Sequence, residues 1–198
     1  MKSKIVVAED EPITRMDICE ILSSSGYNVV GEAADGLQVV DLCRRYKPDL
    51  VIMDIKMPKL DGIQAAQLIM KENLVEAIVM LTAYSGKEFI DQVKKIGAIG
   101  YIIKPINEKT LIPQIEIAIA KGKEIESIKH KITEAKQEVE NTKIIHRAKE
   151  LLMEKYRITE NEAYKKIRKL SMDKQSSILY TSENLLSYYS KLTKCSQK

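Results

Sequence analysis

The first 120 residues alternate short apolar runs with longer segments in which apolar side chains recur every three or four residues. The short runs, rich in β-branched residues, predict strands near 4–8, 28–32, 49–53, 77–81 and 99–103. The longer segments predict amphipathic helices over 12–25, 36–46, 62–72 and 86–96. Gly26 and Gly97 stand where helix C-caps are expected. The alternation predicts an α/β domain with a parallel sheet, five strands and five helices.

Two of the expected strands differ from the others in pattern. Residues 50–53 and 77–81 are continuously apolar. Unbroken apolar strands are typical of the centre of a parallel sheet that is covered on both faces. In such sheets ligands bind at the carboxyl ends of the strands, so we look for chemistry there.

The pattern changes after residue 122. All eight glycines lie at or before Gly122 and all five prolines at or before Pro113, so the remainder is expected to be mostly helical. Apolar residues then follow at alternating spacings of three and four, which is the seam of a short coiled coil over 122–142: Ile125, Ile128, Ile132, Ala135 and Val139. This pattern favours a dimer. It also suits an amphipathic helix that lies on its own N-terminal domain, and both interpretations stay open.

A small three-helix unit is expected over 143–190, followed by a tail over 191–198. The first helix continues through Ala148 and Leu152 and ends near Arg157. Thr159 and Glu162 have the spacing of a capping box, which predicts the start of a second helix. A third apolar-periodic stretch follows Ser176 and Ser177.

The net charge of +4 is unevenly distributed. Residues 1–122 carry 15 basic and 17 acidic side chains, whereas residues 143–198 carry 13 and 6, a local excess of +7. A polyanion is therefore the expected partner of the C-terminal part. The three cysteines, Cys19, Cys43 and Cys195, show no metal or redox spacing, and no stretch is apolar enough to cross a membrane. We expect a cytoplasmic protein with reduced thiols and no membrane partner.

Carboxylates gather where the first and third strands are expected to end. Glu9 and Asp10 follow the first strand, and Asp54 ends the third. If these strands are neighbours, the three carboxylates meet at one edge, where they would repel one another unless a cation such as Mg²⁺ lay between them. Thr82 and Lys104, at the ends of the fourth and fifth strands, add a hydroxyl and an ammonium group. Such a set suits the binding of a phosphoryl group.

These residues resemble the receiver domains of two-component response regulators over residues 3–121. The resemblance implies a flavodoxin-like, doubly wound (βα)₅ fold in a domain over 1–121, followed by a coiled-coil helix and an all-α three-helix output domain. It implies that Asp54 accepts a phosphoryl group from a sensor histidine kinase, and that Mg²⁺ is the cofactor. The protein would be no enzyme in its own right, with autodephosphorylation left open.

The resemblance also assigns roles to the surrounding residues. Asp10 would bind the metal directly, Glu9 would hold one of its waters, and the backbone carbonyl of Lys56 would be a further ligand. Thr82 and Tyr101 would form the switch pair. Lys104 would balance the phosphate charge, with a cis bond before Pro105. Glu9 stands where most members have Asp.

Several of these residues also have ordinary structural interpretations. Single acids such as Asp35, Asp49 and Asp61 are expected to be caps or turn residues. Tyr101 suits a half-buried strand position as well as a switch. Tyr84 would either shield the phosphoryl group from water or be a solvated loop residue.

Residues 143–189 resemble the ANTAR domain, a three-helix RNA-binding module of transcription antiterminators. The resemblance rests on Arg147-Ala148-Lys149 and Leu152-Met153 of the first helix, on Glu162-Ala163-Tyr164 and Ile167-Arg168 of the second, and on Ser171-Met172-Asp173. Two positions depart from the pattern. Glu150 replaces a usual Gly, and Thr181-Ser182 replace an apolar-small pair.

The C-terminal residues also favour RNA on physical grounds. Unpaired bases stack on aromatic rings while phosphates attract Lys and Arg, and Tyr164 lies among several basic side chains. The alternative is that Tyr164 closes the edge of a core and the lysines are a solvated face. The expected RNA contacts are Arg147, Lys149, Tyr164, Arg168, Lys174 and Gln175.

Together these features predict a phosphorylation-activated antiterminator that forms a homodimer when phosphorylated. Its paired output modules would bind RNA hairpins in mRNA leaders and prevent a terminator from folding. Receiver-plus-ANTAR chains of this layout include regulators of ethanolamine utilisation, so that operon is one candidate target. The alternative is a DNA-binding response regulator whose last helices form a helix-turn-helix, which the lack of a glycine turn between them disfavours. A purely protein-binding adaptor would leave the basic segment without a partner.

Overall fold

The computed structural model describes residues 2–83, 91, 93 and 95–195, with side chains up to residue 190. It divides into two compact units, residues 1–128 and 129–198. The first unit contains β1 (Lys4–Ala8), α1 (Pro12–Ser24), β2 (Asn28–Ala33), α2 (Gly36–Tyr46), β3 (Leu50–Asp54), α3 (Gly62–Lys71), β4 (Ala77–Thr82) and β5 (Gly100–Ile103). Helix α5 (Glu108–Tyr156) begins there and continues into the second unit, which also contains α6 (Glu160–Asp173) and α7 (Ile178–Cys195).

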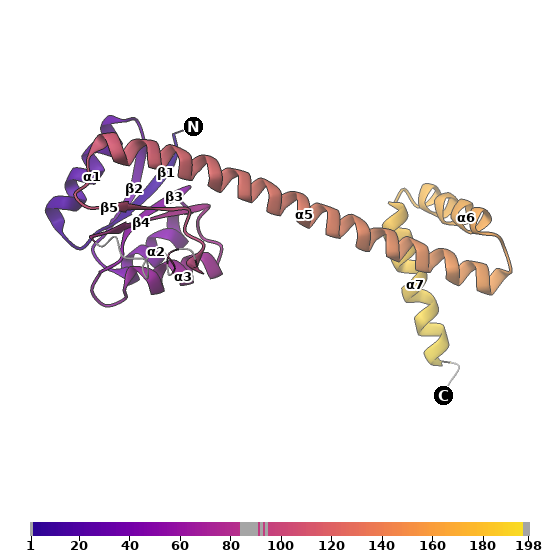
Figure 1. The fold of residues 1–198 in the computed structure, drawn as a ribbon. Helices are drawn as coiled ribbons and strands as arrows, with labels where there is room; N and C mark the ends of the chain where they lie inside the picture. Colours follow the sequence, from indigo (N-terminus) through magenta and orange to yellow (C-terminus); the bar gives the residue numbers. More distant parts are fainter. Residues whose placement is uncertain (1, 84–90, 92, 94, 196–198) are drawn as a thin grey trace. The chain divides into compact units, whose positions relative to one another are not determined.

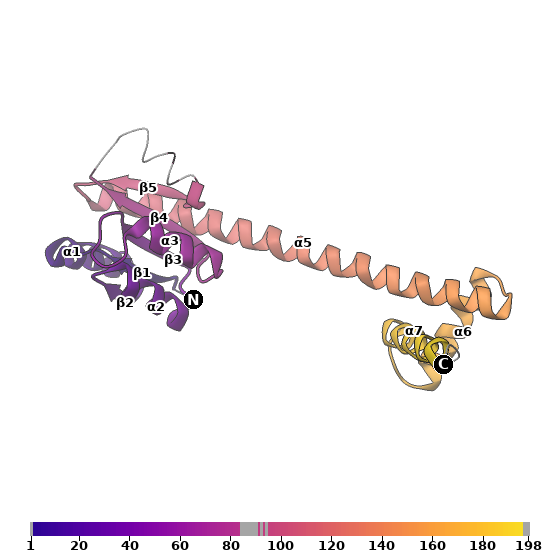
Figure 2. The same ribbon diagram turned by 90° about the horizontal axis from the view of Figure 1, so that it is seen from below.

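The strands form one parallel sheet in the order β2-β1-β3-β4-β5. Every residue of β3 and β4 is buried, which confirms that the two continuously apolar runs are central strands. Helices α2 and α3 cover one face of the sheet, and α1 and the start of α5 cover the other (Figures 1 and 2). The expected doubly wound α/β fold is confirmed.

The sheet is held by an apolar core on each face. On the α5 side, Leu111 and Ile115 are fully buried against the sheet, and burial of each such side chain contributes ~1.5–3 kcal/mol. The opposite core includes Val39, Ala66 and Ile69 of α2 and α3. The central strands β3 and β4 are thereby buried on both faces.

Helix boundaries agree with the sequence signals. Gly26 and Gly97 both adopt positive φ, 88° and 81°, as C-caps require. Of the expected helix 86–96, only residues 91, 93, 95 and 96 lie within the described part, and these are helical. Asp35 and Asp61 cap α2 and α3, where their side chains accept hydrogen bonds from Gln38 N and Gln64 N.

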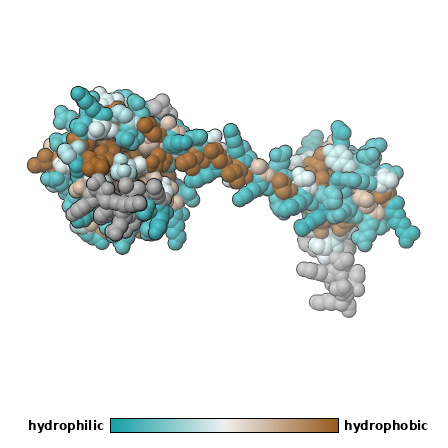
Figure 3. All heavy atoms as spheres, in the orientation of Figure 1, coloured by the Kyte–Doolittle hydropathy of each residue, from teal (hydrophilic) through white to brown (hydrophobic). Residues whose placement is uncertain are grey.

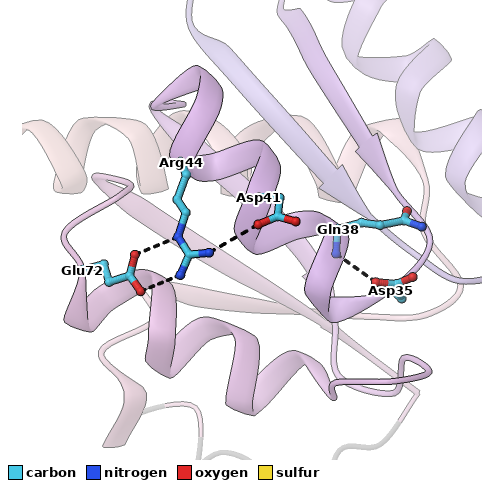
Figure 4. A network of polar contacts seen from close by, with 5 residues as sticks. All are labelled: Asp35, Gln38, Asp41, Arg44 and Glu72. Atoms are coloured by element: carbon cyan, nitrogen blue, oxygen red, sulfur yellow. Dashed lines mark hydrogen bonds and ion pairs between the residues drawn. The ribbon is translucent and has the colours of Figure 1, made fainter.

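A polar network ties α2 to α3 on the solvent side (Figure 4). Arg44 forms two hydrogen bonds with Glu72, at 3.0 and 2.8 Å, and a third contact with Asp41 at 3.3 Å. The Glu72 carboxylate raises the pKa of Arg44, and Arg44 lowers the pKa of Glu72. Because these side chains are exposed, the network contributes little to stability.

Residues 122–142, the expected coiled-coil segment, lie within the uninterrupted helix α5. The helix continues past both expected ends of this segment. Helix α5 ends at Tyr156, followed by Arg157 with a φ of 53°, where the sequence predicts a break. Thr159 and Glu162 form the expected capping box of α6. The domain limits at 121 and 142 remain predictions.

We expect Thr159→Ala to destabilise α6 by about 1 kcal/mol, since it removes the side chain that accepts from Glu162 N. Amide hydrogen exchange across Glu160–Asp173 should then become about five-fold faster. Thr142→Ala is the control, because Thr142 lies inside α5 and its hydroxyl bonds only the helix backbone. Equal exchange in the parent and Thr159→Ala would show that the cap is dispensable.

Candidate functional site

Three carboxylates converge at the carboxyl edge of the sheet. Glu9 directly follows β1, Asp10 comes next, and Asp54 is the last residue of β3, the strand that pairs with β1. One oxygen of each lies within 4.8 Å of the others. Glu9 and Asp54 are buried, whereas Asp10 is exposed to solvent. The expected meeting of these side chains therefore follows from the strand order.

Lys104 pairs with the two buried acids of the cluster. Lys104 Nζ lies 2.7 Å from Glu9 Oε2 and 3.4 Å from Asp54 Oδ2. Burial raises the pKa of Glu9 and of Asp54, although Lys104 opposes both shifts. Burial acts to lower the pKa of Lys104, but the two carboxylates together raise it. Three carboxylates this close repel one another, and a divalent cation between them would offset that repulsion.

The donor set fits a hard divalent cation. Carboxylate oxygens are the ligands that Mg²⁺ prefers, and it is commonly held by one or two carboxylates together with waters. Exposed Asp10 leaves one side of the cluster open to solvent. Lys56, whose carbonyl is expected as a ligand, lies two residues beyond the end of β3 and is exposed.

The remaining expected residues lie on the two adjoining strands. Thr82 ends β4 and is buried. Tyr101 lies in β5 opposite Met80 and is 36% exposed, a half-exposed position compatible with either of its interpretations. The bond between Lys104 and Pro105 is cis, as expected. Tyr84 lies outside the described residues.

Two residues that support the site are absent from the sequence predictions. The position of a Cβ on Gly62 would fall 2.0 Å from the backbone oxygen of Asp54, so only glycine lets α3 begin this close to the strand end. Arg15 donates to the backbone oxygen of Glu9 at 2.6 Å and lies 3.5 Å from Glu32. The Asp61-Gly62 pair at the start of a helix is a sequence signal for the role of Gly62. Nothing in the sequence indicates the contact that Arg15 makes with Glu9.

The second unit is a three-helix module formed by the end of α5, α6 and α7. Its core contains Ala148 and Leu152 of α5 and Ala163 and Ile167 of α6, with α7 packed against them. Thr181 and Ser182, the departures from the ANTAR pattern, are buried in α7 and donate hydrogen bonds to the carbonyls of Ser177 and Ile178. Each hydroxyl bonds the preceding turn of its own helix, which explains how a polar pair fits there.

The expected RNA contacts fall into two groups. Arg147, Arg168, Lys174 and Gln175 are exposed, and so is Tyr164, at 39%. The side chain of Lys149 is only 18% exposed and forms an ion pair with Glu160. Lys149 thus joins α5 to α6, whereas the other residues face solvent.

An aromatic cluster in this unit is also absent from the sequence predictions. The hydroxyls of Tyr156 and Tyr189 lie 2.9 Å apart and link the end of α5 to α7. Lys166 lies over the Tyr156 ring at 4.3 Å, and Lys155 over the Tyr189 ring at 3.9 Å. The hydrogen bond between the two hydroxyls, together with burial, raises the pKa of Tyr189 to about 12. These contacts bind the three helices together, although the residues are far apart in sequence.

The predicted seam lies on a stretch of α5, residues 123–140, in which every residue is exposed. Ile125, Ile128, Ile132 and Val139 are between 42% and 56% exposed, and Ala135 is exposed as well. The space-filling view shows apolar residues along the middle of this helix (Figure 3). Large exposed aliphatic side chains in a row are typical of an interaction surface.

Comparisons with known proteins agree with both units. The family model of the response regulator receiver domain matches residues 5–116, and that of the ANTAR domain matches residues 133–186. The chain is 39% identical to the transcriptional regulatory protein PdtaR of Mycobacterium tuberculosis over 183 residues, which is 92% of this chain and 89% of that protein. It is 32% identical to the chemotaxis protein CheY of Thermotoga maritima over 57% of this chain and 93% of that protein.

Solved structures resemble the first unit. The receiver domain of NarL from Mycobacterium tuberculosis has a TM-score of 0.58 at 28% identity, over 60% of this chain and 97% of that one. A CheX–CheY complex of Borrelia burgdorferi, described with BeF₃ and Mg, has a TM-score of 0.55 at 26% identity, over 57% of this chain and 86% of that one. Within the described residues, no helix is both long and apolar enough for a membrane span.

The ANTAR match decides between the two functions that the sequence left open. It makes the protein a phosphorylation-regulated, RNA-binding antiterminator and sets aside the helix-turn-helix alternative. Ethanolamine utilisation as the target stays a prediction. From its two family matches and its similarity to PdtaR along most of its length, the chain belongs to the response regulators that carry a receiver domain followed by an ANTAR domain.

Proposed function

We propose that Asp54 takes a phosphoryl group from a sensor histidine kinase, with Mg²⁺ held by Glu9, Asp10, Asp54 and the carbonyl of Lys56. The observation that carries this proposal is the convergence of three carboxylates around Asp54 with Lys104 beside them. The complex of a related CheY described with BeF₃ and Mg supports the same chemistry.

Each residue of the cluster has its own role in the proposed phosphoryl transfer. An Asp54 carboxylate oxygen forms the new bond to phosphorus as the bond from phosphorus to the histidine nitrogen breaks. Lys104, already paired with Asp54, balances charge on the phosphoryl oxygens, and the Thr82 hydroxyl donates to one of them. When bound, Mg²⁺ neutralises further charge on the same oxygens. Movement of Thr82 and Tyr101 toward the phosphoryl group would then carry the signal to the β4-β5 side of the receiver.

Asp54→Ala should abolish labelling by acetyl phosphate in the presence of Mg²⁺, because the nucleophile is gone. Labelling is measured by the mass of the intact protein, and chelation of the metal should prevent it in the parent. Asp41→Ala is the matched control, since Asp41 is an exposed carboxylate on α2. Undiminished labelling of Asp54→Ala would place the phosphoacceptor elsewhere.

We further propose that phosphorylation promotes a homodimer through the receiver and the seam of Ile125, Ile128, Ile132, Ala135 and Val139. These side chains are exposed in a single chain and would be buried between two. Complete burial of an aliphatic side chain contributes ~1.5–3 kcal/mol, so even partial burial of paired isoleucines is enough to shift a weak equilibrium. A dimer would bring two output modules to one leader RNA.

The double variant Ile128→Asp, Ile132→Asp should reduce the dimer fraction of the phosphorylated protein, because charges at the seam must be desolvated or held apart. Sedimentation velocity measures this fraction over a range of concentrations. The control places Asp at His130 and Gln137, which lie on the same helix away from the seam. If both variants dimerise at the same concentration as the parent, the seam is not the dimer contact.

We propose that the paired ANTAR modules bind two hairpins in an mRNA leader, one of which overlaps a terminator stem. Bound hairpins would keep the terminator from forming, so that polymerase continues. The exposed Tyr164 and the surrounding basic side chains support RNA contact on α6. A cytoplasmic location follows from these proposed partners.

Tyr164→Ala and Arg168→Ala should weaken RNA binding in different ways. Loss of a stacking ring costs ~1–3 kcal/mol and depends on the loop sequence, while loss of a phosphate contact weakens all RNAs and lowers the salt dependence by about one ion. If Arg168 reads a base edge instead, its loss will also depend on sequence. Binding is measured with a hairpin and its loop-scrambled form at two salt concentrations.

Arg45→Ala is the control for these variants, because Arg45 is exposed on α2 of the receiver. If folded Tyr164→Ala binds both hairpins as the parent does, Tyr164 only closes the edge of the core. A parent that prefers duplex DNA to either hairpin would contradict the RNA proposal.

A further inference from the structure

The ANTAR module contains a pocket between the end of α6 and the first half of α7. Its volume is 480 Å³, which lies within the range of small-ligand sites. Leu170 and Leu185 provide apolar surface, and the buried Thr181 lies among the lining residues. The Thr181 hydroxyl lies 3.0 Å from that of Ser176, which also lines the pocket, so part of the wall is polar and fixed.

The rest of the lining joins an aromatic ring, an amide and a cation. Tyr188 is 60% exposed, and its ring is held edge-on by Tyr189 with centroids 5.3 Å apart. Asn184 presents a side-chain amide, which can both donate and accept hydrogen bonds, and Lys174 adds a positive charge. Among the described residues that line this pocket there is no carboxylate.

We propose that this pocket binds one unpaired nucleobase from the loop of an RNA hairpin, which deepens and rests on the proposed RNA function. A splayed base has two flat apolar faces and a polar edge, which match the leucines, the Tyr188 ring and the Asn184 amide. Lys174 is placed for the adjoining phosphate. A paired base in a duplex stays stacked between its neighbours and does not enter such a cavity.

The pocket is separate from the surface around Tyr164. Residues 164 and 168 lie one turn apart on α6, whereas Leu170 lies in its last turn and Lys174 is its C-cap residue. Because each residue turns the helix by about 100°, Leu170 and Tyr164 are separated by about 120° around the axis. The two surfaces can therefore be tested independently.

The test uses hairpins selected from a pool with randomised loops by the full-length protein. The pocket variants are Asn184→Ala, which removes the amide, and Tyr188→Leu, which keeps apolar volume but removes the ring. Their matched controls are Asn161→Ala on α6 and Tyr180→Leu on α7, both exposed residues that do not line the pocket. Circular dichroism confirms the fold of each variant.

Each base of the selected loop is then removed in turn to leave an abasic site. We expect one abasic position to weaken binding by the parent about ten-fold, and each pocket variant to weaken binding of the intact loop to a similar extent. Removing the base at that position should hardly weaken RNA binding by the pocket variants any further. Both control variants should lose as much binding as the parent does. A 2-aminopurine at the same position should be quenched by the parent and less by Tyr188→Leu.

The proposal is wrong if the pocket variants bind the intact loop as tightly as the parent does. It is also wrong if every abasic substitution weakens binding by the pocket variants as much as it weakens binding by the parent. Neither result would contradict recognition of the loop by the protein as a whole. A parent that selects no loop, or binds duplex DNA equally well, overturns the proposal together with the proposed RNA function. Either result would leave the pocket to a different ligand, such as a peptide side chain.

Discussion

The receiver is organised around an imbalance of charge at the edge of a buried sheet. Glu9 and Asp54 are removed from water and lie beside Asp10, and Lys104 forms ion pairs with the two buried acids. Burial raises the pKa of both buried acids, so each would hold a proton more readily than in water. A protein that only needed stability would place apolar side chains there, because buried charges are costly unless they are paired. The arrangement makes sense for a site that receives a cation and then an anion.

Much of the surrounding structure keeps this edge in place. Gly62 lets α3 begin against the backbone of Asp54. On the other side of the same loop, Lys59 forms a 2.6 Å ion pair with Asp35, the buried cap of α2. A Cβ on Gly36 would lie 2.1 Å from the backbone oxygen of Leu60, so α2 and the loop are also in close contact. The loop after Asp54 is therefore fixed at both ends, and Lys56 lies within it.

The sequence predicts the strands and helices, because apolar periodicity and caps are local signals, whereas the doubly wound topology came from the resemblance to receiver domains. It also predicts that Glu9, Asp10 and Asp54 meet, since the ends of neighbouring parallel strands share an edge. It misses Arg15 and the Tyr156–Tyr189 contact, which depend on side-chain directions across elements. It places Lys149 among the RNA contacts, whereas the ion pair with Glu160 depends on how α6 folds back. The pocket beside Asn184 has no linear signal, because its lining comes from two helices and the turn between them.

Helix α5 carries three different surfaces along one continuous element. Leu111 and Ile115 belong to the receiver core, Ile128 and Ile132 are exposed, and Ala148 and Leu152 belong to the ANTAR core. A second chain that covered the exposed isoleucines would contact the part of α5 that lies between the residues of the two cores. The proposed link between phosphorylation and RNA binding then needs no contact between Asp54 and the output module, only a change in how readily two copies of α5 associate.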